Sequence, residues 1–120
     1  MKNKNLREAS KTVLLIRPLN VALPSGSASI PPLGLLSIGT ILKKKGFDVK
    51  IVDAIKEPDY KKKIIKHAKE ALIVGIGVWT SEVKSAYEIT RLIKNNTNAP
   101  VVWGGWHSTL FPEQIINDPL

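Results

Sequence analysis

The chain has 120 residues, 43% of them apolar, and its 18 Lys and Arg against 10 Asp and Glu give a formal net charge of +8. This length and composition fit one domain with an ordinary hydrophobic core. The absence of cysteine excludes disulfides, thiolate-bound zinc, a cysteine nucleophile and a cysteine-held iron–sulfur cluster. Because there is no secretory apolar region and no apolar run near the ~18 residues of a membrane span, we expect a cytoplasmic protein without a membrane partner.

The first predicted element is a strand over Thr12–Arg17, whose unbroken apolar run is typical of a strand buried on both faces of a parallel sheet. Residues 1–11 before it are expected to form a basic tail. After a loop rich in proline, serine and glycine, Pro31-Pro32 stands where a helix over Leu33–Lys45 can begin, and Gly46 can end it. Helical spacing predicts that one apolar stripe packs on the sheet. The stripe consists of Leu35, Leu36, Ile38, Ile41 and Leu42.

An alternating pattern predicts an edge strand over Asp48–Asp53. It is followed by a lysine-rich helix over Tyr60–Ala68, in which His67 is expected to face solvent. The third strand is predicted over Ala71–Val78, again with the apolar run of a strand buried on both faces. Most of the positive charge lies between Lys43 and Lys69, with ten lysines against four acidic residues. A solvated helix surface is the favoured interpretation, a surface for RNA is the weaker one, and nucleic acid is not expected as a partner.

Ser81 is predicted to cap a helix from Glu82 to Asn95. A fourth strand over Val101–Trp103 and a short helix over Pro112–Asn117 follow. Since strands and helices alternate, we expect an α/β, doubly wound, mainly parallel sheet in the order 2-1-3-4, with helices on both faces. This flavodoxin-like, or Rossmann-like, arrangement is one strand short of the usual five, so residues 12–120 are expected to form a C-terminally incomplete domain.

Ligands of open α/β sheets bind beyond the carboxyl ends of the strands, where the strand order reverses, here between the first and third strands. Glycines at a strand end let a ligand approach the backbone, hydroxyls can hydrogen-bond it, and exposed tryptophans favour a flat apolar ligand. The loops after the first, third and fourth strands therefore supply the candidate residues. The candidate cofactor-binding residues are Pro18, Leu19, Asn20, Trp79, Thr80, Ser81, Gly104, Gly105, Trp106 and His107.

Each of these loops also has a purely structural interpretation. Gly104 and Gly105 can form a tight turn, Ser81 can be only a helix cap, and the tryptophans can cover the sheet edge. His107 can be an ordinary hydrogen-bonding residue. No catalytic set and no metal-ligand set is predicted. Asp53 could accept a ribose hydroxyl, but no G-x-G-x-x-G follows the first strand, so the dinucleotide fingerprint is absent.

Three segments resemble the cobalamin-binding domain that precedes the catalytic barrel of cobalamin-dependent radical S-adenosylmethionine (SAM) enzymes. They are the strand and turn Val13–Pro18, the Pro-Pro-Leu-Gly-Leu helix start at Pro31 that leads to Val52-Asp53, and the Gly-Gly-x-His element at Gly104 followed by Pro112-Glu113. The resemblance covers about residues 12–120. It implies a domain that holds cobalamin with the nucleotide tail of the cofactor extended into the fold.

On that pattern Thr80 and Ser81 would contact the tail, Gly104 and Gly105 would give it space, and the loop after the first strand would lie under the corrin. Better-known cobalamin proteins carry D-x-H-x-x-G in that loop to supply a histidine to cobalt. Residues 18–29 contain no histidine, so no histidine ligand is expected from this loop, and no residue of the chain is assigned to a metal.

Enzymes of this kind typically use cobalamin as a methyl carrier, and their second domain holds a [4Fe–4S] cluster through C-x-x-x-C-x-x-C. Without cysteine, this chain is expected to be a cobalamin-binding module. The cluster and S-adenosylmethionine would then belong to a radical SAM catalytic domain or subunit that acts as its partner. The alternative is a non-catalytic flavodoxin-like interaction domain that binds a nucleotide or a protein partner. An exposed fourth strand could also support an oligomer.

Overall fold

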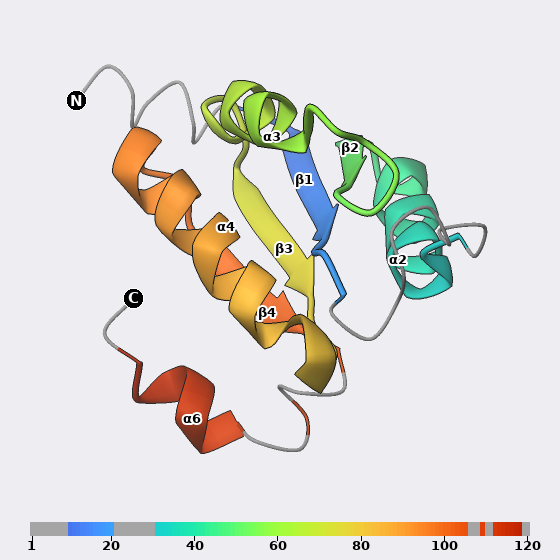
Figure 1. Ribbon diagram of the computed structural model, residues 1–120. Helices are drawn as coiled ribbons and strands as arrows, with labels where there is room; N and C mark the ends of the chain where they lie inside the picture. The colour runs from blue at the N-terminus through green and yellow to red at the C-terminus, as the bar shows by residue number, and fades with distance from the viewer. Residues whose placement is uncertain (1–9, 21–30, 106–108, 110–111, 119–120) are drawn as a thin grey trace.

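The computed structural model describes residues 10–20, 31–105, 109 and 112–118. Its four strands form one parallel sheet in the order β2-β1-β3-β4 (Figure 1). The strands are β1 (Thr12–Arg17), β2 (Asp48–Asp53), β3 (Ile73–Gly77) and β4 (Val101–Gly104). The predicted α/β class and the predicted strand order are therefore confirmed.

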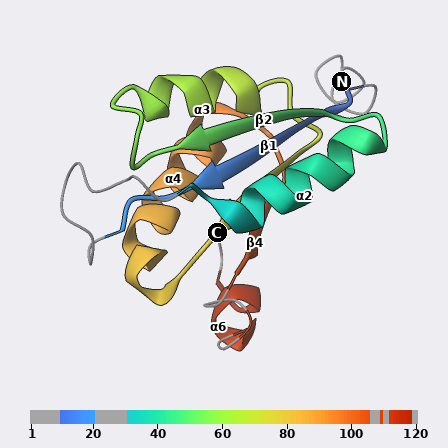
Figure 2. The same ribbon diagram turned by 90° about the vertical axis from the view of Figure 1, so that its right-hand side faces the viewer.

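The register brings the carboxyl ends of all four strands to one edge of the sheet. Arg17 at the end of β1 pairs with Asp53 at the end of β2, and Gly77 at the end of β3 pairs with Gly104 at the end of β4. This edge is where loops of an open α/β sheet form ligand sites. In Figure 2 the arrowheads of β1 and β2 point to it.

The helices cover both faces of the sheet, as predicted, but unequally (Figures 1 and 2). One helix, α2, packs on β1 and β2, while α3 and α4 pack against each other over the opposite face. A 3-10 turn, η1, leads from β3 into α4. The bounds of these elements are α2 (Leu33–Lys44), α3 (Tyr60–Ala68), η1 (Thr80–Glu82), α4 (Val83–Asn96) and the short α6 (Pro112–Ile116).

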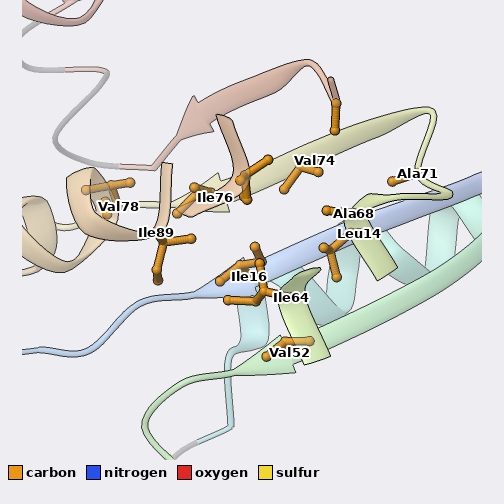
Figure 3. Packing of buried hydrophobic residues seen from close by; sticks show 13 residues of the cluster. Leu14, Ile16, Val52, Ile64, Ala68, Ala71, Val74, Ile76, Val78 and Ile89 are labelled. Carbon is orange, nitrogen blue, oxygen red and sulfur yellow. The ribbon is translucent and has the colours of Figure 1, made fainter. Parts of the chain in front are cut away.

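The main core lies between the sheet and the α3–α4 layer. Alternate strand residues point into it, such as Leu14 and Ile16 of β1 and Ile76 of β3, all at most 1% exposed. Ile64 of α3 and Ile89 of α4 meet them from the helices (Figure 3). Each such side chain contributes roughly 1.5–3 kcal/mol by its removal from water. This packing fixes the strands and thereby the edge that their ends form.

The predicted inward stripe of α2 was wrong in part. Leu36, Ile38 and Ile41 are 41%, 49% and 57% exposed, and Gly39 is the buried residue of this helix. A Cβ added to Gly39 would lie 3.3 Å from the Val49 side chain, so this glycine lets the helix approach the sheet closely. The flank of α2 stays open because, within the described residues, no second helix packs beside it on this face.

The environment of His67 also differs from its prediction. Its side chain is half-buried in the last turn of α3 rather than fully solvent-facing. Burial lowers the pKa of His67, and the positive charges of Lys50 and Lys66 lower it further. Along the described part of the chain, no helix has both the length and the apolar character needed to cross a bilayer.

Candidate functional site

At the carboxyl edge of the sheet, an ion pair joins the last residue of β1 to the last residue of β2. Arg17 Nε and Nη2 donate to Asp53 Oδ1 and Oδ2 at 2.9 and 2.5 Å, and the two side chains are only 14% and 10% exposed. Asp53 Oδ1 also accepts the Ile55 N–H at 3.1 Å. Because both carboxylate oxygens of Asp53 are engaged within the protein, this residue is poorly suited to the ribose-binding role considered from the sequence.

The segment after β1 turns from the core to the edge and is tied to the start of α4. Pro18 is fully buried, whereas Leu19 is 40% exposed. The Leu19 N–H donates to Ser85 Oγ at 2.9 Å, and Asn20 Nδ2 donates to Glu82 Oε2 at 3.2 Å. These two hydrogen bonds fix the β1 segment against a part of the chain more than 60 residues away.

The segment after β3 makes a 3-10 turn before α4 begins. Trp79 precedes this turn and is 58% exposed, Thr80 is exposed and Ser81 is partly buried. The prediction that Ser81 caps the helix was wrong, because α4 begins at Val83 and no side-chain cap hydrogen bond is formed at its start. Instead, the cap is formed one turn earlier, where Glu82 Oε1 accepts the Trp79 N–H at 3.0 Å.

Glu82 is a site residue that the sequence reasoning missed. Its side chain is 4% exposed, and burial raises its pKa, while the hydrogen bonds from Trp79 and Asn20 and the charge of Arg17 act in the opposite direction. The signal that could have identified it is an acidic residue three positions after Trp79, the residue that precedes the turn, which is the spacing of a capping box.

The two glycines after β4 have different roles. Gly105 has φ +89°, and a Cβ placed on it would lie 3.0 Å from both the N and the O of Val78. Gly104 accepts the Val78 N–H at 2.8 Å through its carbonyl, yet a Cβ on Gly104 would meet no atom within 4 Å. The tight-turn interpretation therefore explains Gly105, whereas Gly104 borders open space. Trp106 and His107, the other predicted residues of this loop, lie outside the described residues.

The fold thus brings most of the predicted residues to one edge. Leu19 is hydrogen-bonded to Ser85, and Asn20 is hydrogen-bonded to Glu82. Trp79 follows Val78, whose N–H donates to the Gly104 carbonyl. The surface that results has an exposed indole, an exposed leucine and an open glycine. Such a surface suits a large, flat, partly apolar ligand held against backbone. Within residues 10–20, 31–105, 109 and 112–118, no group of three or more His, Asp or Glu could hold a metal ion.

A separate cavity of about 100 Å³ lies between α4, β4 and α6. Tyr87 donates its hydroxyl hydrogen bond to Asp118 there, and Trp103 Nε1 donates to Thr90 Oγ1 at 3.0 Å. The Tyr87 and Trp103 rings meet edge to face, with centroids 5.0 Å apart. Ligand pockets usually measure about 300–1,000 Å³, so this cavity is too small for a cofactor and belongs to the packing of α6.

Comparison with protein families matches residues 21–119 to the B12 binding domain. An uncharacterised methyltransferase of Pyrococcus horikoshii is 36% identical over 112 residues, which cover 90% of this chain and 24% of that protein. The anaerobic magnesium-protoporphyrin IX monomethyl ester cyclase of Synechocystis sp. is 29% identical over 115 residues, which cover 90% of this chain and 22% of that protein. No solved structure matches significantly.

The chain spans about a quarter of the length of these curated relatives. The family match extends over most of the chain and includes the loops after β3 and β4. It agrees with the resemblance inferred from the sequence and with the doubly wound sheet. The chain therefore belongs to the B12-binding domain family.

Proposed function

We propose that this chain holds cobalamin at the carboxyl edge of its sheet and presents it to a radical SAM catalytic domain or subunit. The observation that carries the proposal is the open space at Gly104 beside a strand edge where Trp79 and Leu19 are exposed. A flat, partly apolar macrocycle with an extended tail needs such a surface, with backbone that it can approach and apolar side chains that it can cover.

The described residues fit this cofactor in distinct ways. Leu19 and Trp79 supply exposed apolar surface, and Thr80 and Ser81 supply hydroxyl groups for polar atoms of the tail. Gly104 leaves room that a side chain would fill. Pro18 is buried, so its contribution is to direct the β1 segment toward the edge. Trp106 and His107 remain candidates from the sequence.

When bound, cobalamin supplies a cobalt centre that can carry a methyl group. The residues of this chain bind and orient the cofactor. Since residues 18–29 contain no histidine, we infer that the loop after β1 provides no imidazole to cobalt.

The catalytic part of the proposal is supported by the relatives. One is named as a methyltransferase and the other as a magnesium-protoporphyrin monomethyl ester cyclase, and both are about four times as long as the matched region. An iron–sulfur cluster held by cysteines cannot form within this chain, which has none. We infer that residues 12–120 form the cofactor-holding domain and that the cluster and S-adenosylmethionine are bound by a partner domain or subunit.

The test is binding of hydroxocobalamin to the purified chain, measured by co-elution in gel filtration and by visible absorption. We expect corrinoid to elute with the wild-type protein, with the spectrum of cobalamin whose dimethylbenzimidazole base is not coordinated to cobalt. Free corrinoid that elutes entirely apart from the folded protein would refute the proposal. A spectrum with the base still on cobalt would refute the extended-tail part of it.

A matched pair of variants locates the site. Gly104→Leu adds a side chain where no neighbouring atom lies within 4 Å, and the φ of Gly104 is not positive, so we expect the variant to fold and to bind cobalamin at least tenfold more weakly. Val102→Leu is the control, because it adds volume to the same strand two residues earlier, at a side chain that is 51% exposed. Equal loss of binding in both variants would argue against the carboxyl edge as the site.

A further inference from the structure

A buried carboxylate joins two of the loops that form the carboxyl edge. Glu82 lies in the turn η1 and is 4% exposed. Its Oε1 accepts the Trp79 backbone N–H at 3.0 Å, and its Oε2 accepts the Asn20 side-chain amide at 3.2 Å. One side chain therefore connects the segment after β1 with the segment after β3, on either side of the point where the strand order reverses.

Burial of a carboxylate is unfavourable unless its lone pairs are occupied. Arg17 of β1 and Asp53 of β2 are the charged groups that act on Glu82 from the neighbouring strand ends, with opposite effects, and they are already paired with each other. Glu82 accepts hydrogen bonds from the Asn20 side-chain amide and from the Trp79 backbone N–H. The two hydrogen bonds offset part of this cost, because they satisfy the Trp79 N–H at the cap of η1 and the Asn20 amide.

The consequence of the two hydrogen bonds is geometric. The hydrogen bond to Glu82 holds the Trp79 backbone at the start of η1 and so fixes the position from which the exposed indole extends. The second bond holds Asn20, the residue after the exposed Leu19. The hydrogen bond from the Leu19 N–H to Ser85 Oγ also holds the segment after β1 in place. The distance between the two exposed apolar side chains thus depends on Glu82.

We propose that Glu82 is a positioning residue, which fixes the spacing of the Leu19–Asn20 segment and the Trp79 turn so that both contact the same bound corrinoid. This inference rests on the proposed function and adds to it the residue that preorganises the site. Glu82 itself touches the backbone of Trp79 and the amide of Asn20, and it is assigned no contact with the cofactor.

The test compares three variants of the full chain. Glu82→Met keeps the length and removes both acceptors, and Glu82→Gln keeps an acceptor for the Trp79 N–H and an amide that can pair with Asn20. Glu88→Gln alters an exposed acid of the following helix, α4. Loss of two hydrogen bonds predicts a roughly tenfold higher Kd for hydroxocobalamin in Glu82→Met. Glu82→Gln is expected to stay within about threefold of wild type, and Glu88→Gln is expected to leave the Kd unchanged.

A second readout needs no cofactor. Amide hydrogen exchange, measured by NMR, is expected to show a protected Trp79 N–H in the wild type and in Glu82→Gln, and a faster exchange in Glu82→Met. The Ile76 N–H, in the centre of the sheet, is expected to be equally protected in all of them. A merely structural role would instead lower the urea midpoint and the affinity of Glu82→Met together, without a selective loss of protection at the Trp79 N–H.

The possible failures are distinguishable. If the wild-type chain binds no hydroxocobalamin, the proposed function is refuted and the positioning role with it. If the wild type binds and folded Glu82→Met binds equally well, only the positioning role is refuted. Should Glu82→Met not fold, Asn20→Leu breaks the same link from the other side. Unchanged affinity in Asn20→Leu would also refute the role, and a weaker affinity with faster Trp79 exchange would support it.

Discussion

Replacement of Asp53 by alanine is expected to destabilise the fold far more than replacement of the acid at the other end of the same strand. Asp53 accepts two hydrogen bonds from Arg17 at 2.9 and 2.5 Å, with the side chains 10% and 14% exposed. Removing one partner of a buried pair costs about 3–5 kcal/mol, because the other charge loses its counter-ion. Because both side chains keep some exposure to solvent, we expect a cost near the lower end of this range, about 3 kcal/mol.

Urea unfolding followed by far-ultraviolet circular dichroism measures this cost. With an m-value of about 1.5–2 kcal/mol per M, the midpoint of Asp53→Ala is expected to fall by about 1.5–2 M. Asp48→Ala is the control, since Asp48 is 59% exposed and lies 3.7 Å from Lys50, and such surface pairs contribute at most about 1 kcal/mol. Similar decreases of the urea midpoint in the two variants would refute the claim that the Arg17–Asp53 pair stabilises the ends of β1 and β2.

Two further predictions concern the same edge. Gly105→Ala is expected to cost about 1–3 kcal/mol, because its φ is +89° and the new Cβ would lie 3.0 Å from the Val78 backbone; an unchanged thermal midpoint would contradict this. The stability difference between wild type and Glu82→Gln is expected to depend on pH, since burial raises the folded-state pKa of Glu82. Because the folded state favours protonated Glu82, this group stabilises the fold at pH below its unfolded-state pKa of about 4.3. The contribution is lost as the pH rises through the folded-state pKa. Urea unfolding at several pH values between about 4 and 7 tests this, and an advantage of wild type that grows with pH would refute it.

The fold was largely predictable because periodicity depends on local sequence. The strand over Thr12–Arg17 and the helix over Tyr60–Ala68 were predicted with their observed bounds, since buried parallel strands and amphipathic helices have distinct patterns. The exposure of the stripe on α2 was not predictable in the same way. Its apolar spacing is regular, but whether the stripe is covered depends on which other helices reach that face of the sheet.

The candidate site was predictable as a location and less so in its contacts. The rule that ligands bind at the carboxyl ends of parallel strands identified the loops after β1, β3 and β4. The partner of a buried polar group is a long-range property, as when Asn20 and Glu82, 62 residues apart, form one hydrogen bond. Sequence spacing favoured Ser81 as a cap, but Glu82 accepts the Trp79 N–H at the start of η1, and α4 begins at Val83.

Gly104 and Gly105 illustrate why a motif must be separated into its members before function is assigned to it. In the sequence they form a single Gly-Gly pair, which equally predicts a turn or a ligand-contacting backbone. The structure gives Gly105 a positive φ and a close contact with the Val78 backbone, and it gives Gly104 neither. The folding requirement therefore explains Gly105, whereas a Cβ added to Gly104 would meet no atom of the described residues within 4 Å. Under the proposed function Gly104 leaves space for the cofactor, so Gly105 variants test folding and Gly104 variants test the proposed binding.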